Sequence, residues 1–271
     1  MKHVAKKRFG QNFLTDIAVI NSLVQAINPQ FNQTIVEIGP GLGALTKPLL
    51  AKIQHLHVIE IDRDIVSWMQ SEYAKQAYAN NTLVIHNVDA LKFDFSQLVE
   101  DAKPLRVTGN LPYNISTPIL FHLLDHLSQI TDMHFMLQKE VVERMVAKPS
   151  TPAYGRLSVM LQYHLAMEYL FTVPPEAFEP APKVESAFVR CVPHGILPHI
   201  AMDSALFAKI IMAAFGQRRK TIRNTLKDFL NDDDYIQINS LQEEKIGSQL
   251  RAENLSVKDF VCISNYISNH P

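Results

Sequence analysis

The segment Asn110-Leu111-Pro112-Tyr113 combines the residue types that chemistry on an aromatic amine requires. The lone pair of such an amine is delocalised into the ring, so its nitrogen needs acceptors aimed at both N–H groups to become nucleophilic. The side-chain oxygen of Asn110 and the main-chain carbonyl of Leu111 can serve as these two acceptors. Pro112 supports this role, because it keeps Leu111 extended and adds no competing N–H. Tyr113 can stack on a base that has left its helix or loop. Adenine N6 fits as a methyl acceptor, and such a transfer needs neither a strong base nor a metal. The segment does not show whether the adenine belongs to DNA or to RNA.

The elements around this segment predict where it lies. Between residues 34 and 137, short apolar runs alternate with longer amphipathic ones, a pattern typical of a parallel sheet covered on both faces. Ligands bind at the carboxyl edge of such a sheet, so the place of Asn110 after the fourth strand favours a site over an ordinary turn. We expect strands at 34–38, 57–61, 83–86, 106–108 and 133–137, and helices at 45–52 and 65–73.

A nucleotide-binding pattern precedes the segment. The first expected strand runs into Gly39, Gly41 and Gly43, where glycine allows a sharp turn and close approach of a ligand. Glu60 ends the second strand about twenty residues later and can accept two hydrogen bonds from a ribose diol. Asp89 follows the third strand and could accept from a cofactor adenine amine or simply cap a turn. The pattern predicts an adenosine-type cofactor but does not separate methyltransferases from dehydrogenases.

The pattern changes after Tyr169. A Pro-rich loop separates the expected strands 170–173 and 186–192, so an antiparallel pair closing the sheet is the simpler prediction. From Asp203 onward, apolar residues recur at helical spacing. We therefore predict an α/β fold with a mostly parallel, Rossmann-like sheet: a cofactor-binding domain at 1–199 and a small helical domain at 200–271.

Composition and charge bound the class of protein. The two cysteines are far apart and suggest neither a disulfide framework nor a zinc site, and no apolar run is long enough to span a membrane. We expect a soluble, cytoplasmic protein. The net charge is only −1, yet basic residues gather in two stretches, which could face phosphates or simply be solvated. These candidates are Lys6, Lys7 and Arg8 in an N-terminal arm and Arg218, Arg219, Lys220 and Arg223 around a predicted helix.

Blocks along almost the whole chain resemble the bacterial small-subunit ribosomal RNA adenine dimethyltransferase family. They are KKRFGQNFL, VEIGPGLGALT, IEID, NLPYNISTP, MLQKEV, AYGRLSV, FEPAPKVES, QRRKTIRN and RAENLS. The resemblance implies a class I S-adenosylmethionine-dependent methyltransferase fold. It also implies that two adjacent adenosines in the 3′-terminal hairpin of 16S rRNA, within the small ribosomal subunit or its precursor, become N6,N6-dimethyladenosine.

The same resemblance implies roles for individual residues. Phe178 would face Tyr113 across the target base, although by itself it reads as a core residue. The basic stretches would bind RNA. The cofactor would be S-adenosylmethionine, without a metal, and it would be held by Gln11, Asn12, Leu14, Gly39, Gly41, Glu60, Ile61, Asp89, Ala90 and Asn110.

Three alternatives stand beside this interpretation. A large-subunit rRNA adenine methyltransferase of the antibiotic-resistance type would share the fold and chemistry, but the match through the C-terminal blocks disfavours it. A non-catalytic RNA-binding assembly factor is disfavoured by the presence of Glu60, Asp89 and Asn110. A nicotinamide dehydrogenase would leave the NLPY segment and the basic stretches unexplained.

Overall fold

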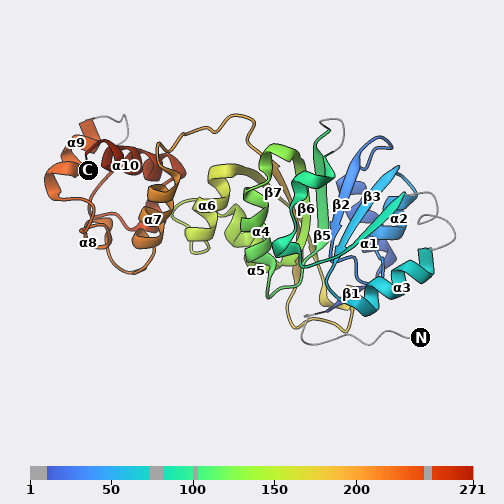
Figure 1. Ribbon diagram of the computed structural model, residues 1–271. Coiled ribbons are helices and arrows are strands. Elements are labelled where there is room, and N and C mark those ends of the chain that lie inside the picture. Colours follow the sequence, from blue (N-terminus) through green and yellow to red (C-terminus); the bar gives the residue numbers. More distant parts are fainter. Residues whose placement is uncertain (1–10, 74–81, 100–102, 241–245, 271) are drawn as a thin grey trace. The chain divides into compact units, whose positions relative to one another are not determined.

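The computed structural model describes residues 11–73, 82–99, 103–240 and 246–270 (Figure 1). Its contacts divide the chain into two compact units, one of residues 1–142 and 167–193 and the other of residues 143–166 and 194–271. This division differs from the predicted boundary at residues 199 and 200, because residues 143–166 lie with the C-terminal helices. The physical reason is a shared core, in which Tyr154 and Val159 pack with Phe207 and Phe260.

The first unit is built on a seven-stranded sheet in the order β4-β3-β2-β5-β6-β9-β7. Neighbours among the first five are parallel, β9 runs antiparallel to β6, and β7 forms the outer edge. The prediction of a mostly parallel sheet with an antiparallel strand near one edge is confirmed. The strands are β2 (Thr34–Ile38), β3 (His55–Glu60), β4 (Leu83–Asn87), β5 (Leu105–Asn110), β6 (Ile130–Gln138), β7 (Leu165–Val173) and β9 (Ser186–Pro193).

One face of the sheet is covered by α1 (Ile17–Ile27), α2 (Thr46–Leu50) and α3 (Arg63–Tyr73), whose apolar side chains share one core with strand residues such as Leu56 and Val58. Helix α1 begins where the Asp16 carboxylate accepts hydrogen bonds from the amides of Ala18 and Val19, at 2.8 and 3.0 Å. It ends at Asn28, whose φ of 48° is left-handed. Leu23, Val24 and Ile27 lie on its buried side.

The opposite face carries a chain of ring contacts. Side chains alternate along a strand, so His57 of β3 points away from the face of Leu56 and Val58. Its ring stacks on His86 of β4, and ring contacts continue through Phe93 and Phe95 to His122 of α4 (Ser116–Leu124). Helix α4 therefore packs on this second face, where Ile119, Leu120 and Leu123 are buried.

A buried ion pair ties the centre of the sheet to α1. The Arg106 guanidinium on β5 donates to both carboxylate oxygens of Asp132 on β6, at 2.7 and 2.8 Å. The same group donates to the carbonyl of Ile27 at 2.6 Å, which satisfies the end of α1. Both side chains are almost fully buried, so loss of one partner would leave a charge uncompensated.

The second unit is helical. Its core is formed by side chains from α6 (Arg156–His164), α7 (Ser204–Ala214), α8 (Ile222–Thr225), α9 (Asp232–Ser240) and α10 (Val257–Asn269), while α5 (Lys139–Val146) begins in the first unit and ends in the second. Of the basic residues placed around a predicted helix, only Arg223 is helical. Arg218, Arg219 and Lys220 lie in turns between α7 and α8, because α7 ends at Ala214 and Thr221 starts the next helix.

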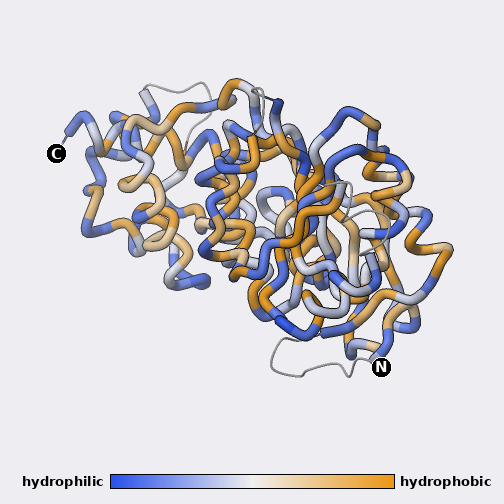
Figure 2. The backbone as a smooth tube through the Cα atoms, turned by 45° about the vertical axis from the view of Figure 1, so that its right-hand side comes forward, coloured by the Kyte–Doolittle hydropathy of each residue, from blue (hydrophilic) through white to orange (hydrophobic). Residues whose placement is uncertain are grey.

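Figure 2 shows hydrophobic and hydrophilic residues alternating along the chain, and the hydrophobic residues of the strands, such as Ile35, Val58 and Val107, are buried. Over the parts of the chain that the structure describes, no helix has both the length and the apolar composition needed to cross a membrane.

The ring contacts that begin at His57 lead to a prediction about the stability of the fold at acid pH. Burial, followed by repulsion from His86 and His55, lowers the pKa of His57 from 6.5 to about 4. Between these values the unfolded chain binds a proton that the folded chain does not, so the free energy of unfolding falls as pH drops from 6.5 to 4. Glu37, whose pKa is raised to about 7, acts in the opposite direction.

The substitution His57→Gln keeps a hydrogen-bonding group toward His86 but removes the titrating ring. From pH 7.5 to pH 5, we therefore expect the free energy of unfolding to decrease by about 1 kcal/mol less in this variant than in the wild type. Urea unfolding at the two pH values, followed by the fluorescence of Trp68, measures the difference. Equal losses in both proteins would contradict the assignment to His57.

Candidate active site

The turn between β2 and α2 forms the floor of a cavity in the first unit. Gly39 and Gly41 have φ values of 67° and 55°, a left-handed conformation that side chains disfavour. A Cβ atom on Gly41 would lie 3.1 Å from the Phe13 ring, so the turn has no room for a side chain there. The Gly39 amide donates to the carbonyl of Ile59 at 2.9 Å, which joins the turn to β3.

Glu60 presents a buried carboxylate at the end of β3. Its Oε1 accepts from the Asp62 amide at 2.8 Å, and the amides of Ile61 and Gly41 also bond to the carboxylate. Burial raises the pKa of Glu60 above its usual value, and these hydrogen bonds counteract part of that effect. The carboxylate is thus held in a fixed position at the cavity wall, beside the half-exposed side chain of Ile61.

Asp89 caps a turn, which is one of the two roles that its sequence position left open, and it also lies at the cavity. One carboxylate oxygen accepts from the Leu91 amide at 3.0 Å and caps a short 3₁₀ helix at Ala90–Lys92. Asp89 and Ala90 also line the cavity. Capping therefore orients Asp89 at the cavity edge.

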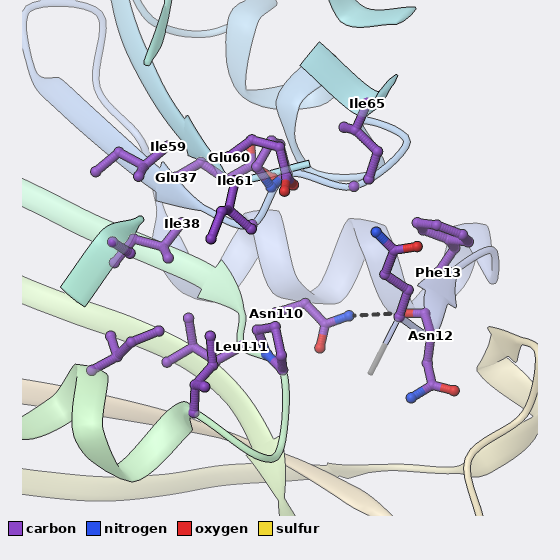
Figure 3. A pocket seen from close by; sticks show the side chains of 18 of the residues that line it. Asn12, Phe13, Glu37, Ile38, Ile59, Glu60, Ile61, Ile65, Asn110 and Leu111 are labelled. Carbon is purple, nitrogen blue, oxygen red and sulfur yellow. Dashed lines mark hydrogen bonds between the residues drawn. The ribbon is translucent and has the colours of Figure 1, made fainter. Parts of the chain in front are cut away.

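Asn110 ends β5, and its side-chain amide has a defined orientation. The Nδ2 group donates to the main-chain carbonyl of Asn12 at 3.2 Å, which is the dashed contact in Figure 3. Because the N–H end of the amide is used there, Oδ1 is the end suited to accept a hydrogen bond from a ligand. Leu111 is fixed next to it, since its amide donates to the carbonyl of Met136 on β6 at 3.1 Å.

Residues 11–16 form a segment, here called the arm, that crosses the cavity. Gln11 donates to the Asp62 carboxylate at 3.1 Å, and Phe13 lies against Gly41. The strand β1 (Phe13–Leu14) pairs antiparallel with β8 (Phe178–Glu179). The arm therefore contacts the glycine turn, Asn110 and β8.

These elements enclose a cavity of about 280 Å³. Every residue predicted for the cofactor lines it, together with Leu111, Pro112 and Tyr113. Phe178 does not line it, because this side chain is 4 % exposed and packs in the core with Met136 and Phe188. Its predicted role opposite Tyr113 stays a prediction.

Glu37 and Phe13 are among the lining residues that were not predicted from sequence. Glu37 is buried within β2, accepts from the Thr46 hydroxyl at 2.6 Å, and has a pKa raised to about 7, chiefly by burial. The sequence feature that could have identified Glu37 is a carboxylate inside an otherwise apolar strand. Phe13 carried no such signal, because its contact with Gly41 depends on the path of the arm.

Two of the basic residues predicted to bind RNA, Arg218 and Arg219, line a different cavity, of about 270 Å³, in the second unit. Arg218 is held by hydrogen bonds to the Pro152 carbonyl at 2.7 Å and to Glu253 at 3.4 Å. Arg219 and Arg251 also line this cavity, and sequence analysis missed Arg251. Arg223 instead pairs with Asp232. Lys6, Lys7 and Arg8 lie outside the described residues.

Comparison with known proteins gives consistent matches over nearly the whole chain. The family model described as ribosomal RNA adenine dimethylase matches residues 2–269. Two relatives, each called ribosomal RNA small subunit methyltransferase A, are 64 % identical over 99 % of this chain and 100 % of theirs (Methylobacillus flagellatus) and 54 % identical over 99 % and 98 % (Nitrosospira multiformis).

Solved structures share the fold. A dimethyladenosine transferase from Plasmodium falciparum aligns with a TM-score of 0.73 at 23 % identity, over 93 % of this chain and 95 % of that one. The 23S rRNA methyltransferase ErmE aligns with a TM-score of 0.71 at 19 % identity, over 95 % and 100 %. The expected methyltransferase fold is thus confirmed.

Glu60 yields a prediction about nucleoside binding. Glu60→Gln keeps the size of the side chain but weakens its acceptor strength, so the affinity for S-adenosylhomocysteine should fall about tenfold by calorimetry. Glu72→Gln removes the same charge at an exposed position of α3 and should bind normally. Equal affinities in the two variants would remove Glu60 from the binding site.

Proposed function

Because the chain belongs to the ribosomal RNA adenine dimethylase family, we propose that it transfers methyl groups from S-adenosylmethionine to N6 of two adjacent adenosines in the 3′-terminal hairpin of 16S rRNA. Family membership makes the chain an enzyme that methylates adenine in ribosomal RNA. The observation that carries the proposal is the oriented amide of Asn110, which stands at the edge of a cavity built for a nucleoside.

The cavity fits the proposed cofactor. The left-handed glycines leave space for a ligand close to the backbone, and the Glu60 carboxylate can accept from two ribose hydroxyls. Asp89 can accept from the adenine amine, while Ile61 and Ala90 offer apolar surface to the ring. When bound, S-adenosylmethionine supplies an electron-poor methyl group on sulfur, which leaves as a neutral thioether. Gln11, Asn12 and Leu14 cover the cofactor from the arm.

Asn110 and Leu111 supply the chemistry at the acceptor. In this proposal, Asn110 Oδ1 and the Leu111 carbonyl accept from the two N–H groups of N6 and draw the nitrogen out of conjugation. Pro112 adds no competing donor, and Tyr113 stacks on the base. The methylated amine is acidic enough to lose its proton to water or to Asn110, so the step needs neither a strong base nor a metal.

The small-subunit target is supported by the relatives named above, which match the chain from end to end. The resemblance to ErmE is one of fold, and therefore does not favour a large-subunit target. We infer that the substrate is 16S rRNA within the small ribosomal subunit or its precursor, and that the enzyme acts in the cytoplasm, where these particles are assembled.

RNA contacts are proposed for the basic cavity of the second unit. Arg218, Arg219 and Arg251 come from two segments distant in sequence and face one cavity, so they can hold a backbone phosphate. Lys220 adjoins them. The ion pair of Arg223 with Asp232 makes Arg223 a weaker candidate than its sequence position indicated.

The decisive test incubates the protein with labelled cofactor and, in separate reactions, with unmethylated small and large ribosomal subunits. The RNA is then digested to nucleosides, and the labelled products are separated. Dimethyladenosine from the small-subunit reaction supports the proposal. Label confined to large-subunit RNA would favour the resistance-type enzyme, and RNA binding without transfer would favour an assembly factor.

Asn110→Ala should reduce methyl transfer at least a hundredfold, because it removes one of the two acceptors that activate N6. The loss should persist at saturating cofactor, and the melting temperature should change little. Asn32→Ala, at an exposed loop position, is the matched control. Transfer by Asn110→Ala within a few-fold of wild type would exclude the assigned role.

The substitutions Arg219→Ala and Arg251→Ala should each weaken RNA binding several-fold. Each should also make the negative slope of log affinity against log salt concentration shallower by about one, as the loss of one phosphate contact requires. Filter binding at several salt concentrations measures both quantities. Arg156→Ala removes an exposed arginine of the same unit that does not line the cavity and should leave the slope unchanged. Unchanged slopes in the first two variants would place the phosphate contacts elsewhere.

A further inference from the structure

Tyr113 is held at both ends. Its main-chain carbonyl accepts from the Ser116 hydroxyl at 3.2 Å, at the start of α4. Its phenol oxygen lies 2.7 Å from the Ser186 hydroxyl, within hydrogen-bond distance. The ring between these ends lines the cavity and is partly exposed to it. The main chain of Tyr113 and the phenol end of its ring are therefore each tied by a contact, which fixes the direction of the ring axis; the contact at the phenol end is made with a residue 73 positions later in the chain.

Ser186 is itself firmly placed. It is fully buried and is the first residue of β9, where it pairs with Gln138 at the end of β6. The preceding residue, Glu185, accepts from the Lys139 amide at 3.0 Å through its carbonyl and pairs with the Lys139 ammonium at 2.8 Å through its carboxylate. The Ser186 hydroxyl thus belongs to a paired end of the sheet, on a strand that is separated from β5 and Asn110 by β6 alone.

We propose that Ser186 is a positioning residue for methyl transfer, which acts by fixing the ring of Tyr113 in the orientation that stacks on the target base. This inference rests on the proposed function of the Asn110–Tyr113 segment. An aromatic side chain that is immobilised before the base arrives does not lose rotational freedom when it stacks. A fixed ring also sets the direction from which N6 approaches the two acceptors, to which transfer rates are sensitive.

Two substitutions remove the same hydrogen bond from opposite ends. Tyr113→Phe keeps the stacking surface and changes only a partly exposed hydroxyl, so it should fold normally. Ser186→Ala leaves the phenol without its partner. Each should slow single-turnover transfer to small ribosomal subunits about three- to tenfold at saturating cofactor and RNA, with affinities for both within twofold of wild type. The double variant should be no slower than the slower single variant, because both remove one contact.

A matched control separates positioning from a general loss of stability. Ser158 is also fully buried, and its hydroxyl bonds to the Arg144 carbonyl in the second unit. Ser158→Ala should lower the melting temperature as Ser186→Ala does, while its transfer rate stays at the wild-type value. Equal slowing by Ser158→Ala and Ser186→Ala would assign the effect to stability and overturn the inference.

The remaining outcomes distinguish the inference from the proposed function. Wild-type rates in Tyr113→Phe, or multiplicative effects in the double variant, would overturn the role of Ser186 while dimethyladenosine formation by the wild type still supports the function. A wild-type protein that forms no dimethyladenosine in the same assay would overturn both.

Discussion

Parallel pairing of β2, β3, β4 and β5 is the constraint on which the site depends. Strands that run in one direction end at one edge, so the glycine turn, Glu60, Asp89 and Asn110 meet there although 71 positions separate the first from the last. The buried Arg106–Asp132 pair fixes β5 against β6 and α1. Without this alignment the acceptor on Asn110 would not face the nucleoside groups.

The edge of the sheet supplies the chemical groups, and other segments orient them. The carbonyl of Asn12 determines which end of the Asn110 amide is available as an acceptor, and the amides around Glu60 hold its carboxylate in place. All of these contacts are made between groups of the chain itself. Catalysis in this proposal therefore depends on groups that need little rearrangement when the base arrives.

Much of this arrangement was predictable from sequence, because strand periodicity and glycine spacing report directly on backbone geometry. The parallel strands of the sheet and the polar groups at their ends, Glu60, Asp89 and Asn110, follow from such local patterns. The assignment of residues 143–166 to the helical unit depends on packing between distant segments, and so does the contact of Arg218 with the carbonyl of Pro152. The bond from Asn110 to Asn12 uses a main-chain carbonyl, which no residue type reveals.

The pairing of β1 with β8 has a consequence for synthesis. The arm is among the first parts of the chain to be made, yet Thr15 bonds to a carbonyl 162 positions later, and β8 itself follows β7. Contacts of such long range form slowly and only after both partners exist. A growing chain therefore cannot complete the wall that the arm gives the cavity until nearly all of the first unit has emerged, and a truncated product that ends before residue 178 would lack the strand that anchors the arm.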